Sequence, residues 1–200
     1  MTRIARILSG WAGFCVLCCA APAMAAAERA IPDGVPGAVP GTVSGTWQHR
    51  KATFNYFGVT TLFTCDGLES HVKEILLLLG ARRDAKVIAT GCPGPYNQPT
   101  HTAFVRADFY ALAPATDAAA AGTVQAHWAP LRVEPLHPSF MTEDDCELIE
   151  EMKDFITQNF SLRDIEYRTT CVPRQLTLGA FAVKGQSLQA VATVPAAVKG

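Results

Sequence analysis

The segment CDGLESHVKEILLLLGARRDAKVIATGC, residues 65–92, decides the fold because it places a leucine-rich helix and a short strand between two cysteines. A helix over 66–80 rises about 22 Å, at roughly 1.5 Å per residue. A strand over 85–91 returns about 23 Å, at roughly 3.3 Å per residue. Since the two lengths match, the chain comes back to where it started, and Cys65 and Cys92 are expected to meet in a disulfide.

A second pair of cysteines encloses a similar segment between Cys146 and Cys171, with a helix expected after the first and a strand before the second. Four cysteines can pair in three ways, and the matched lengths favour the two local pairings over the crossed ones. Each local disulfide closes a loop that contributes about 3 kcal/mol in the chain-entropy model. The sequence therefore predicts the disulfides Cys65–Cys92 and Cys146–Cys171.

Each of these segments has one predicted strand before it and another after it, so the chain reads as two β-α-β-β units over 53–112 and 123–184. Aligned on their first cysteines, the segments match Glu69 with Glu150 and place apolar residues at equivalent positions, which indicates a diverged internal repeat. We expect an α+β fold in which six mainly antiparallel strands form one sheet, with two helices packed on one face. Two small abutting lobes are the alternative.

The N-terminus has the pattern of a secretory signal peptide. Arg3 and Arg6 precede an apolar run over 7–20, which is shorter than a membrane span of about 20 residues. Small residues then occupy the positions that signal peptidase requires before a cleavage site after Ala25. We expect a signal peptide over 1–25 and a periplasmic or secreted protein with no stable membrane span. An uncleaved anchor is the alternative.

The rest of the chain divides by composition. Residues 26–46 are rich in Pro and Gly and predict a flexible linker. The Ala- and Val-rich end, 187–200, has no strand alternation and predicts a frayed tail. A single α+β domain is therefore expected over 47–186, with a loop near 113–122 between its two units.

Charge and motifs argue against several classes of function. The chain has 17 Lys and Arg against 18 Asp and Glu. The first 25 residues hold two of the arginines and no acid, so the mature balance is 15 against 18, or −3. This balance predicts no nucleic-acid partner. No nucleophile elbow or phosphate-binding loop is present, and we assign no catalytic residue and no cofactor.

The histidines do not have the spacing of a metal site. His71 is expected to face solvent beside the apolar stripe of its helix. His137 lies in a proline-bounded loop and is the better candidate, because loops often carry function, whereas His127 on a strand is more typical of a packing or edge residue. The binding candidates are His101, His127, His137 and the neighbouring Trp128. The acidic run 143–151 is interpreted as the solvated start of a helix, with a weak calcium site or a site for a basic partner as the alternative.

The aromatic residues of the first strand divide between the two faces of the expected sheet. In a regular strand Phe54 and Tyr56 share one face, and Phe57 lies on the other. If both helices cover the first face, the second is either solvated or binds a partner. An exposed apolar face would mark the site of a partner or ligand. The commoner alternative is ordinary core packing with a few aromatic rings at the surface.

Three segments carry a resemblance to known proteins. FNYFGVTTLFTCDGLE, DDCELIEEMKDFI and YRTTCVP resemble a group of small exported proteins of Gram-negative bacteria, over residues 47–183. No activity accompanies that group. The resemblance therefore implies the compartment and the fold, and it assigns no catalytic residue.

The leading hypothesis is an exported, disulfide-bonded, non-enzymatic module that binds a protein or a cell-envelope component. One rival is a hydrolase or metal-dependent enzyme whose site combines His101, His127 and His137 with acidic residues. Another rival is a structural protein of the envelope.

Overall fold

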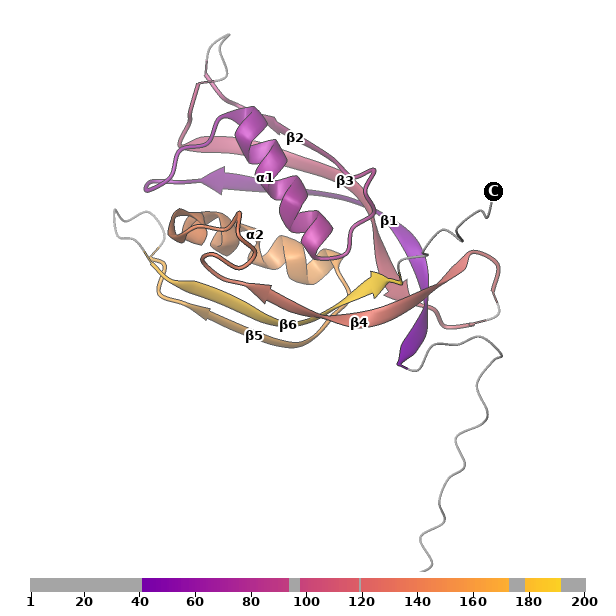
Figure 1. Cartoon of the computed structure of the whole chain (residues 1–200). Helices are drawn as coiled ribbons and strands as arrows, with labels where there is room; N and C mark the ends of the chain where they lie inside the picture. The colour runs from indigo at the N-terminus through magenta and orange to yellow at the C-terminus, as the bar shows by residue number, and fades with distance from the viewer. Residues whose placement is uncertain (1–40, 94–97, 119, 173–178, 192–200) are drawn as a thin grey trace, which may run out of the picture. The chain divides into compact units, whose positions relative to one another are not determined.

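The computed structural model describes residues 41–93, 98–118, 120–172 and 179–191, all within one compact unit. Its elements follow the order strand, helix, strand, strand twice (Figure 1). The first half contains β1 (Thr42–Phe57), α1 (Cys65–Leu78), β2 (Lys86–Thr90) and β3 (Thr102–Pro114). The second half contains β4 (Thr123–Val133), α2 (Cys146–Asn159), β5 (Leu162–Thr169) and β6 (Phe181–Ala190), and a 3-10 turn, Glu143–Asp145, leads into α2.

The strands form one six-stranded antiparallel sheet in the order β2-β3-β1-β4-β6-β5. This arrangement confirms the predicted single sheet over the alternative of two lobes. From edge to centre, the first half reads β2-β3-β1 and the second reads β5-β6-β4. Within the sheet, the described strands of the two halves pair where Thr42–Thr46 of β1 lies against Thr123–His127 of β4, while β1 continues along β3 as far as Phe57.

Both helices pack on one face of the sheet, as the sequence predicted. Helix α1 begins after Thr64, whose hydroxyl accepts a hydrogen bond from the amide of Gly67 at 3.0 Å, and it ends before Gly80, which adopts a φ of +94°. The leucines and other apolar residues of both helices share one core with the inward-facing residues of the strands. Neither helix of the described chain has the length and apolar character needed to cross a bilayer.

Each helix is tied to the strand that follows it by a disulfide. The Cα atoms of Cys65 and Cys92 lie 5.9 Å apart, and those of Cys146 and Cys171 lie 5.8 Å apart. Both predicted pairings are confirmed. In each case the first cysteine opens the helix and the second follows the returning strand, so the disulfide closes the helix–strand pair at its open end.

The predicted domain limits, 47–186, are too narrow at the N-terminal side. Residues Thr42–Thr46 were assigned to the linker, but they form the start of β1 and pair with β4. A Cβ on Gly45 would come within 3.3 Å of both Ala126 Cβ and Leu112 Cδ2, so glycine allows the strands to approach closely here. The pairing partner lies far away in sequence, and no local apolar alternation announced the strand.

The C-terminal limit is also too narrow. The tail was predicted to fray from residue 187, yet β6 continues to Ala190, which pairs with Ala126 of β4. The backbone groups of the last residues of β6 are therefore hydrogen-bonded within the sheet. The predicted signal peptide, 1–25, most of the linker and the end of the tail lie outside the described residues.

Candidate functional site

The face of β2, β3 and β1 that points away from the helices forms an open surface, which we call the outer face. Strand alternation places Phe54 and Tyr56 in the core, at 9% and 1% exposure, and Phe57 on the opposite side at 37%. The strand register aligns the outward side chains in rows across the three strands. The outer face consists of His49, Lys51, Thr53, Asn55 and Phe57 of β1, Lys86, Ile88 and Thr90 of β2, and Thr102, Phe104, Arg106, Asp108 and Tyr110 of β3.

The apolar side chains of the outer face gather toward one end of the strands. Ile88 is 52% exposed and Phe104 is 39% exposed. In the register, Ile88 lies opposite Arg106, two residues along β3 from Phe104, so the two apolar side chains are diagonal neighbours. An open hollow of about 550 Å³ lies beside Phe104, with Phe57 also on its wall and Glu151 of α2 at its side.

Positive charge exceeds negative charge on the outer face. Arg82, from the turn after α1, lies 3.7 Å from the centre of the Tyr110 ring and is paired with Asp84. Counting these two with the face, four cations stand against two carboxylates, a surplus of two in a chain whose net charge is −1. The cations are Lys51, Arg82, Lys86 and Arg106, and the carboxylates are Asp84 and Asp108.

Asp108 holds the polar centre of the outer face. Its carboxylate lies 2.6 Å from His49 Nε2 and 3.8 Å from Lys51 Nζ. The hydrogen bond from His49, together with the charges of Lys51 and Lys86, lowers the pKa of Asp108 below its ordinary value, against the smaller opposing effect of desolvation. This carboxylate therefore stays ionised and its positive neighbours are partly neutralised.

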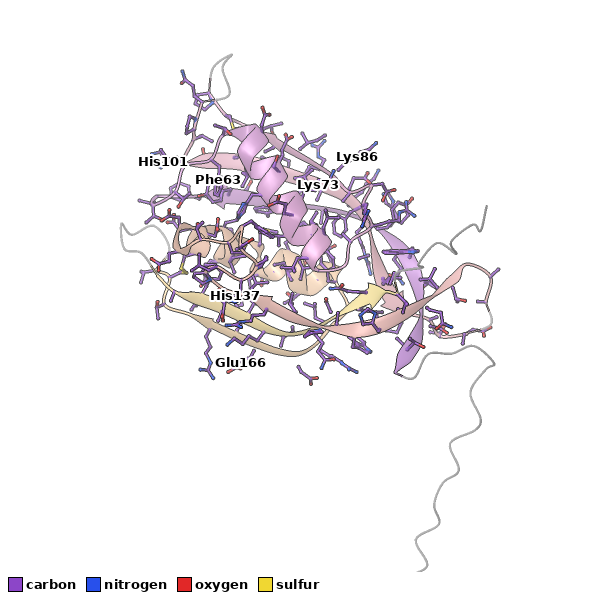
Figure 2. The ribbon with its side chains drawn as sticks, in the orientation of Figure 1. Phe63, Lys73, Lys86, His101, His137 and Glu166 are labelled. Carbon is purple, nitrogen blue, oxygen red and sulfur yellow. A yellow bond between two sulfur atoms is a disulfide. The ribbon has the colours of Figure 1, made fainter. Side chains whose placement is uncertain are left out.

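Two of the predicted binding candidates lie at separate places in the loops (Figure 2). The ring of His101 donates a hydrogen bond from Nδ1 to the carbonyl oxygen of Gly58, at 2.8 Å, and so fixes the turn that follows β1. His137 follows β4, is 56% exposed, and lies 4.0 Å from Glu134.

The other two candidates, His127 and Trp128, are neighbours on β4 but point to opposite faces. Trp128 packs against a small second cluster formed by Leu112, Ala126 and Leu188, and Arg163 lies 4.5 Å from the centre of its ring. The Nδ1 atom of His127 is buried and has no hydrogen-bond partner among the described residues. The four candidates thus do not form one site.

His71 was predicted to face solvent, and that prediction is wrong. Its Nε2 atom lies 3.0 Å from Oδ1 of Asp145, and its side chain is 16% exposed. The rings of Phe63 and Phe140 lie against it, with centroids 5.7 and 5.5 Å away. On its own helix, His71 lies beside the apolar stripe and would be exposed. The segment before α2 packs against this side of α1 and buries it.

The acidic run 143–151 is only partly solvated. Glu143 and Asp144 are exposed as predicted, but Asp145 and Glu147 are 2% and 5% exposed. Asp145 accepts hydrogen bonds from the backbone amide and the hydroxyl of Thr142. Part of the run therefore serves the packing of α2. In the described ranges, no group of three or more His, Cys, Asp or Glu side chains is arranged to hold a metal ion.

Glu147 fastens α2 to the loop that follows β1. Its Oε2 atom accepts hydrogen bonds from the amides of Val59 and Thr60, at 2.8 and 2.9 Å, and from the Thr60 hydroxyl at 2.7 Å. Burial alone raises the pKa of this carboxyl, but these donors outweigh it and the pKa lies below its ordinary value of 4.5. The other oxygen, Oε1, is buried and accepts no hydrogen bond from the described chain.

Comparisons of the chain with family models, with curated proteins and with solved structures found no match. The functional argument therefore depends on the chemistry of the surface itself. Among the described residues, the outer face combines exposed apolar side chains with a surplus of cations, a composition suited to docking a partner.

Proposed function

We propose that the chain is an exported, non-enzymatic module that binds a protein or another component of the cell envelope through its outer face. The observation that carries this proposal is the apolar group Ile88, Phe104 and Phe57, exposed on the one sheet face that the helices leave open and bordered by Lys86 and Arg106. Exposed apolar patches with polar rims mark interaction sites in folded proteins.

Export is part of the same proposal. The N-terminal pattern favours a signal peptide over 1–25 with cleavage after Ala25, and the resemblance to small exported proteins of Gram-negative bacteria favours the same compartment. The disulfides Cys65–Cys92 and Cys146–Cys171 support it, because such bonds persist in oxidising compartments such as the periplasm.

We also infer that the two halves are diverged copies of one β-α-β-β unit. The mirrored strand orders, β2-β3-β1 and β5-β6-β4, and the equivalent positions of the two disulfides support this inference. Under this inference the copies differ in surface chemistry, since the second half pairs Glu166 with Lys184 across β5 and β6 and the first half presents Ile88 and Arg106 across β2 and β3.

The proposal predicts that Ile88→Asp weakens capture of an envelope partner by the immobilised protein at least about tenfold, since one desolvated apolar anchor is worth 1–3 kcal/mol. Ile88 is exposed, so the variant should keep the unfolding midpoint of the wild type. Leu136→Asp is the matched control, because Leu136 is 71% exposed and lies outside the outer face.

Partner capture from solubilised envelopes, quantified by mass spectrometry against both variants, measures the effect. The proposal fails if the wild type captures no partner, or if both variants capture it equally well. Stoichiometric zinc in the purified protein would instead favour a metal-dependent enzyme.

A further inference from the structure

We infer that the partner presents to the outer face an acidic polypeptide segment that carries apolar side chains. This inference rests on the proposed function and names the chemistry of the partner. Its starting point is that the cations of the outer face outnumber the carboxylates there.

Two cations of the outer face are available to a partner. Lys86 and Arg106 have no described carboxylate within ion-pair distance, although Asp108 and Asp84 act on Lys86 from farther away, whereas Lys51 and Arg82 pair directly with Asp108 and Asp84. The guanidinium of Arg106 lies 5.9 Å from the centre of the Phe104 ring, beside the apolar group. A planar guanidinium at the edge of an apolar patch is suited to a carboxylate, which it can bind through two parallel hydrogen bonds.

The spacing of these side chains matches an extended chain. Lys86 and Ile88 are alternate residues of β2, so they lie about 7 Å apart along the strand. An extended partner has the same spacing between its own alternate side chains. It can therefore place a carboxylate near Lys86 or Arg106 while an apolar side chain packs on Ile88 and Phe104.

The partner is expected to lie on the face of the sheet and not to add a strand to its edge. β2 is the edge strand, and its outward amide at Ala89 already donates a hydrogen bond to Oε1 of Glu69 on α1, at 2.8 Å. That contact blocks a continuous ladder of backbone hydrogen bonds with an added strand.

A narrow acidic segment fits better than an anionic membrane surface. Three strands are only about 10 Å across, since neighbours are about 4.8 Å apart. A bilayer covers a wider area than this strip and would meet residues well beyond it. The net charge of −1 opposes that broad contact, whereas a single segment can be confined to the positive strip.

The experiment measures binding of a fluorescein-labelled ten-residue peptide in which Glu and Leu alternate, by anisotropy, against a matched peptide of alternating Gln and Leu. We expect the Glu peptide to bind at least about tenfold more tightly and to lose affinity as salt is raised. The double variant Lys86→Glu/Arg106→Glu should lose about tenfold or more. Arg168→Glu, a reversal on β5, should bind like the wild type.

Equal binding of the two peptides, binding of neither, or an unchanged affinity of the double variant would overturn the inference. Sedimentation with vesicles containing phosphatidylglycerol, without binding of the Glu peptide, would overturn it in favour of a membrane surface. The inference can fail while the proposed function holds. If Ile88→Asp weakens capture of an envelope partner and Lys86→Glu/Arg106→Glu does not, the outer face is still a binding surface, but its partner is not acidic.

Discussion

Replacing Phe155 by alanine is expected to lower the free energy of unfolding by about 3–5 kcal/mol, the loss typical of a buried phenylalanine. Phe155 belongs to α2 in the second half, but its ring packs against Phe54 of β1 and Phe109 of β3 in the first. The side chain is 5% exposed. The substitution would thus leave a cavity between the two halves of the fold.

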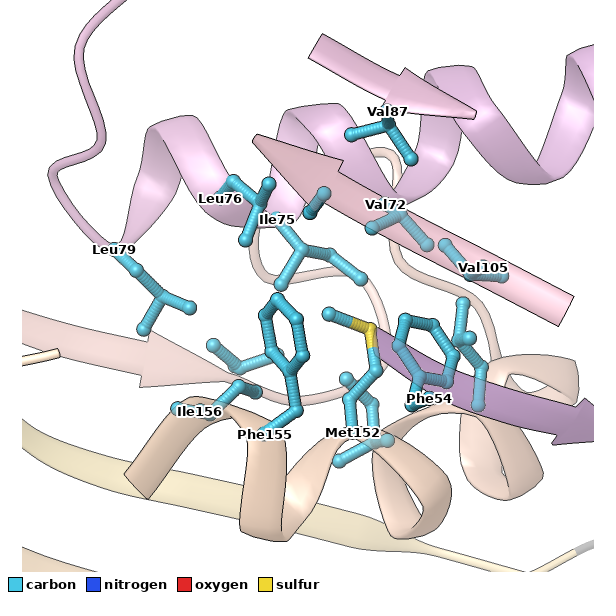
Figure 3. Close-up of a cluster of buried hydrophobic side chains, with 14 of the residues drawn as sticks. Phe54, Val72, Ile75, Leu76, Leu79, Val87, Val105, Met152, Phe155 and Ile156 are labelled. Carbon is cyan, nitrogen blue, oxygen red and sulfur yellow. The ribbon is translucent and has the colours of Figure 1, made fainter. Parts of the chain in front are cut away.

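Figure 3 shows the buried side chains that surround Phe155. Phe155 and Met152 rise from α2 toward Val72 and Ile75 of α1, so the space is enclosed by two helices and the sheet. Both disulfides hold the helices close to their own strands, which limits how far α2 can collapse into the gap.

Urea unfolding followed by circular dichroism measures the loss, with Phe57→Ala as the matched control. Phe57→Ala removes the same ring from an exposed position on the outer face. Its free energy of unfolding should therefore differ from that of the wild type by less than about 1 kcal/mol. If Phe155→Ala and Phe57→Ala are equally stable, the two halves do not share the core described here.

The second large effect is expected at Glu147, where substitution by alanine should cost about 2–4 kcal/mol, since hydrogen bonds to a charged group are worth 1.5–3 kcal/mol each and do not add fully. The substitution removes the one acceptor shared by Val59 and Thr60. The loop after β1 would then lose its attachment to α2.

This contribution depends on pH in a definite direction. Because the pKa of Glu147 lies below 4.5 in the folded protein, the folded state favours the ionised carboxylate. Its contribution is complete above about pH 5.5 and is lost as pH falls through 4.5 and below. The stability difference between wild type and Glu147→Ala should therefore narrow with acidification, as measured by urea unfolding between pH 7 and pH 3.

Glu74→Ala on the exposed side of α1 is the control, because it removes a solvated carboxylate from a helix. It should change stability by less than about 0.5 kcal/mol at every pH. A constant difference between wild type and Glu147→Ala across the pH range would contradict the hydrogen-bonding role of this carboxylate.

Local patterns in the sequence predicted the order of the elements and both disulfides. The helical spacing of Leu68, Val72 and Ile75 is a local signal, and all three are buried. The disulfide pairings were predicted from the matched lengths of a helix and the next strand, which is also a local signal. By contrast, the first five residues of β1 carry no apolar alternation, and only their pairing with β4, about 80 positions away, makes them a strand.

The candidate site was predictable only in part. Alternation placed Phe57 opposite Phe54 and Tyr56, but the sequence left open whether that second face is solvated or binds a partner. Which side chains join it depends on strand register: Ile88 and Phe104 come together only through the pairing of β2 with β3. The positive surplus of the outer face could not be predicted from composition, because the net charge counts its cations together with the acids of the whole chain.

Two claims are central: the protein is exported, and each half of its fold is closed by its own disulfide. A non-reducing peptide map of the protein, expressed with its full N-terminus and recovered from the periplasm, tests this directly. We predict a chain that begins at residue 26, with linked peptides containing Cys65–Cys92 and Cys146–Cys171. Free thiols, or a peptide that links Cys65 to Cys146, would contradict the account.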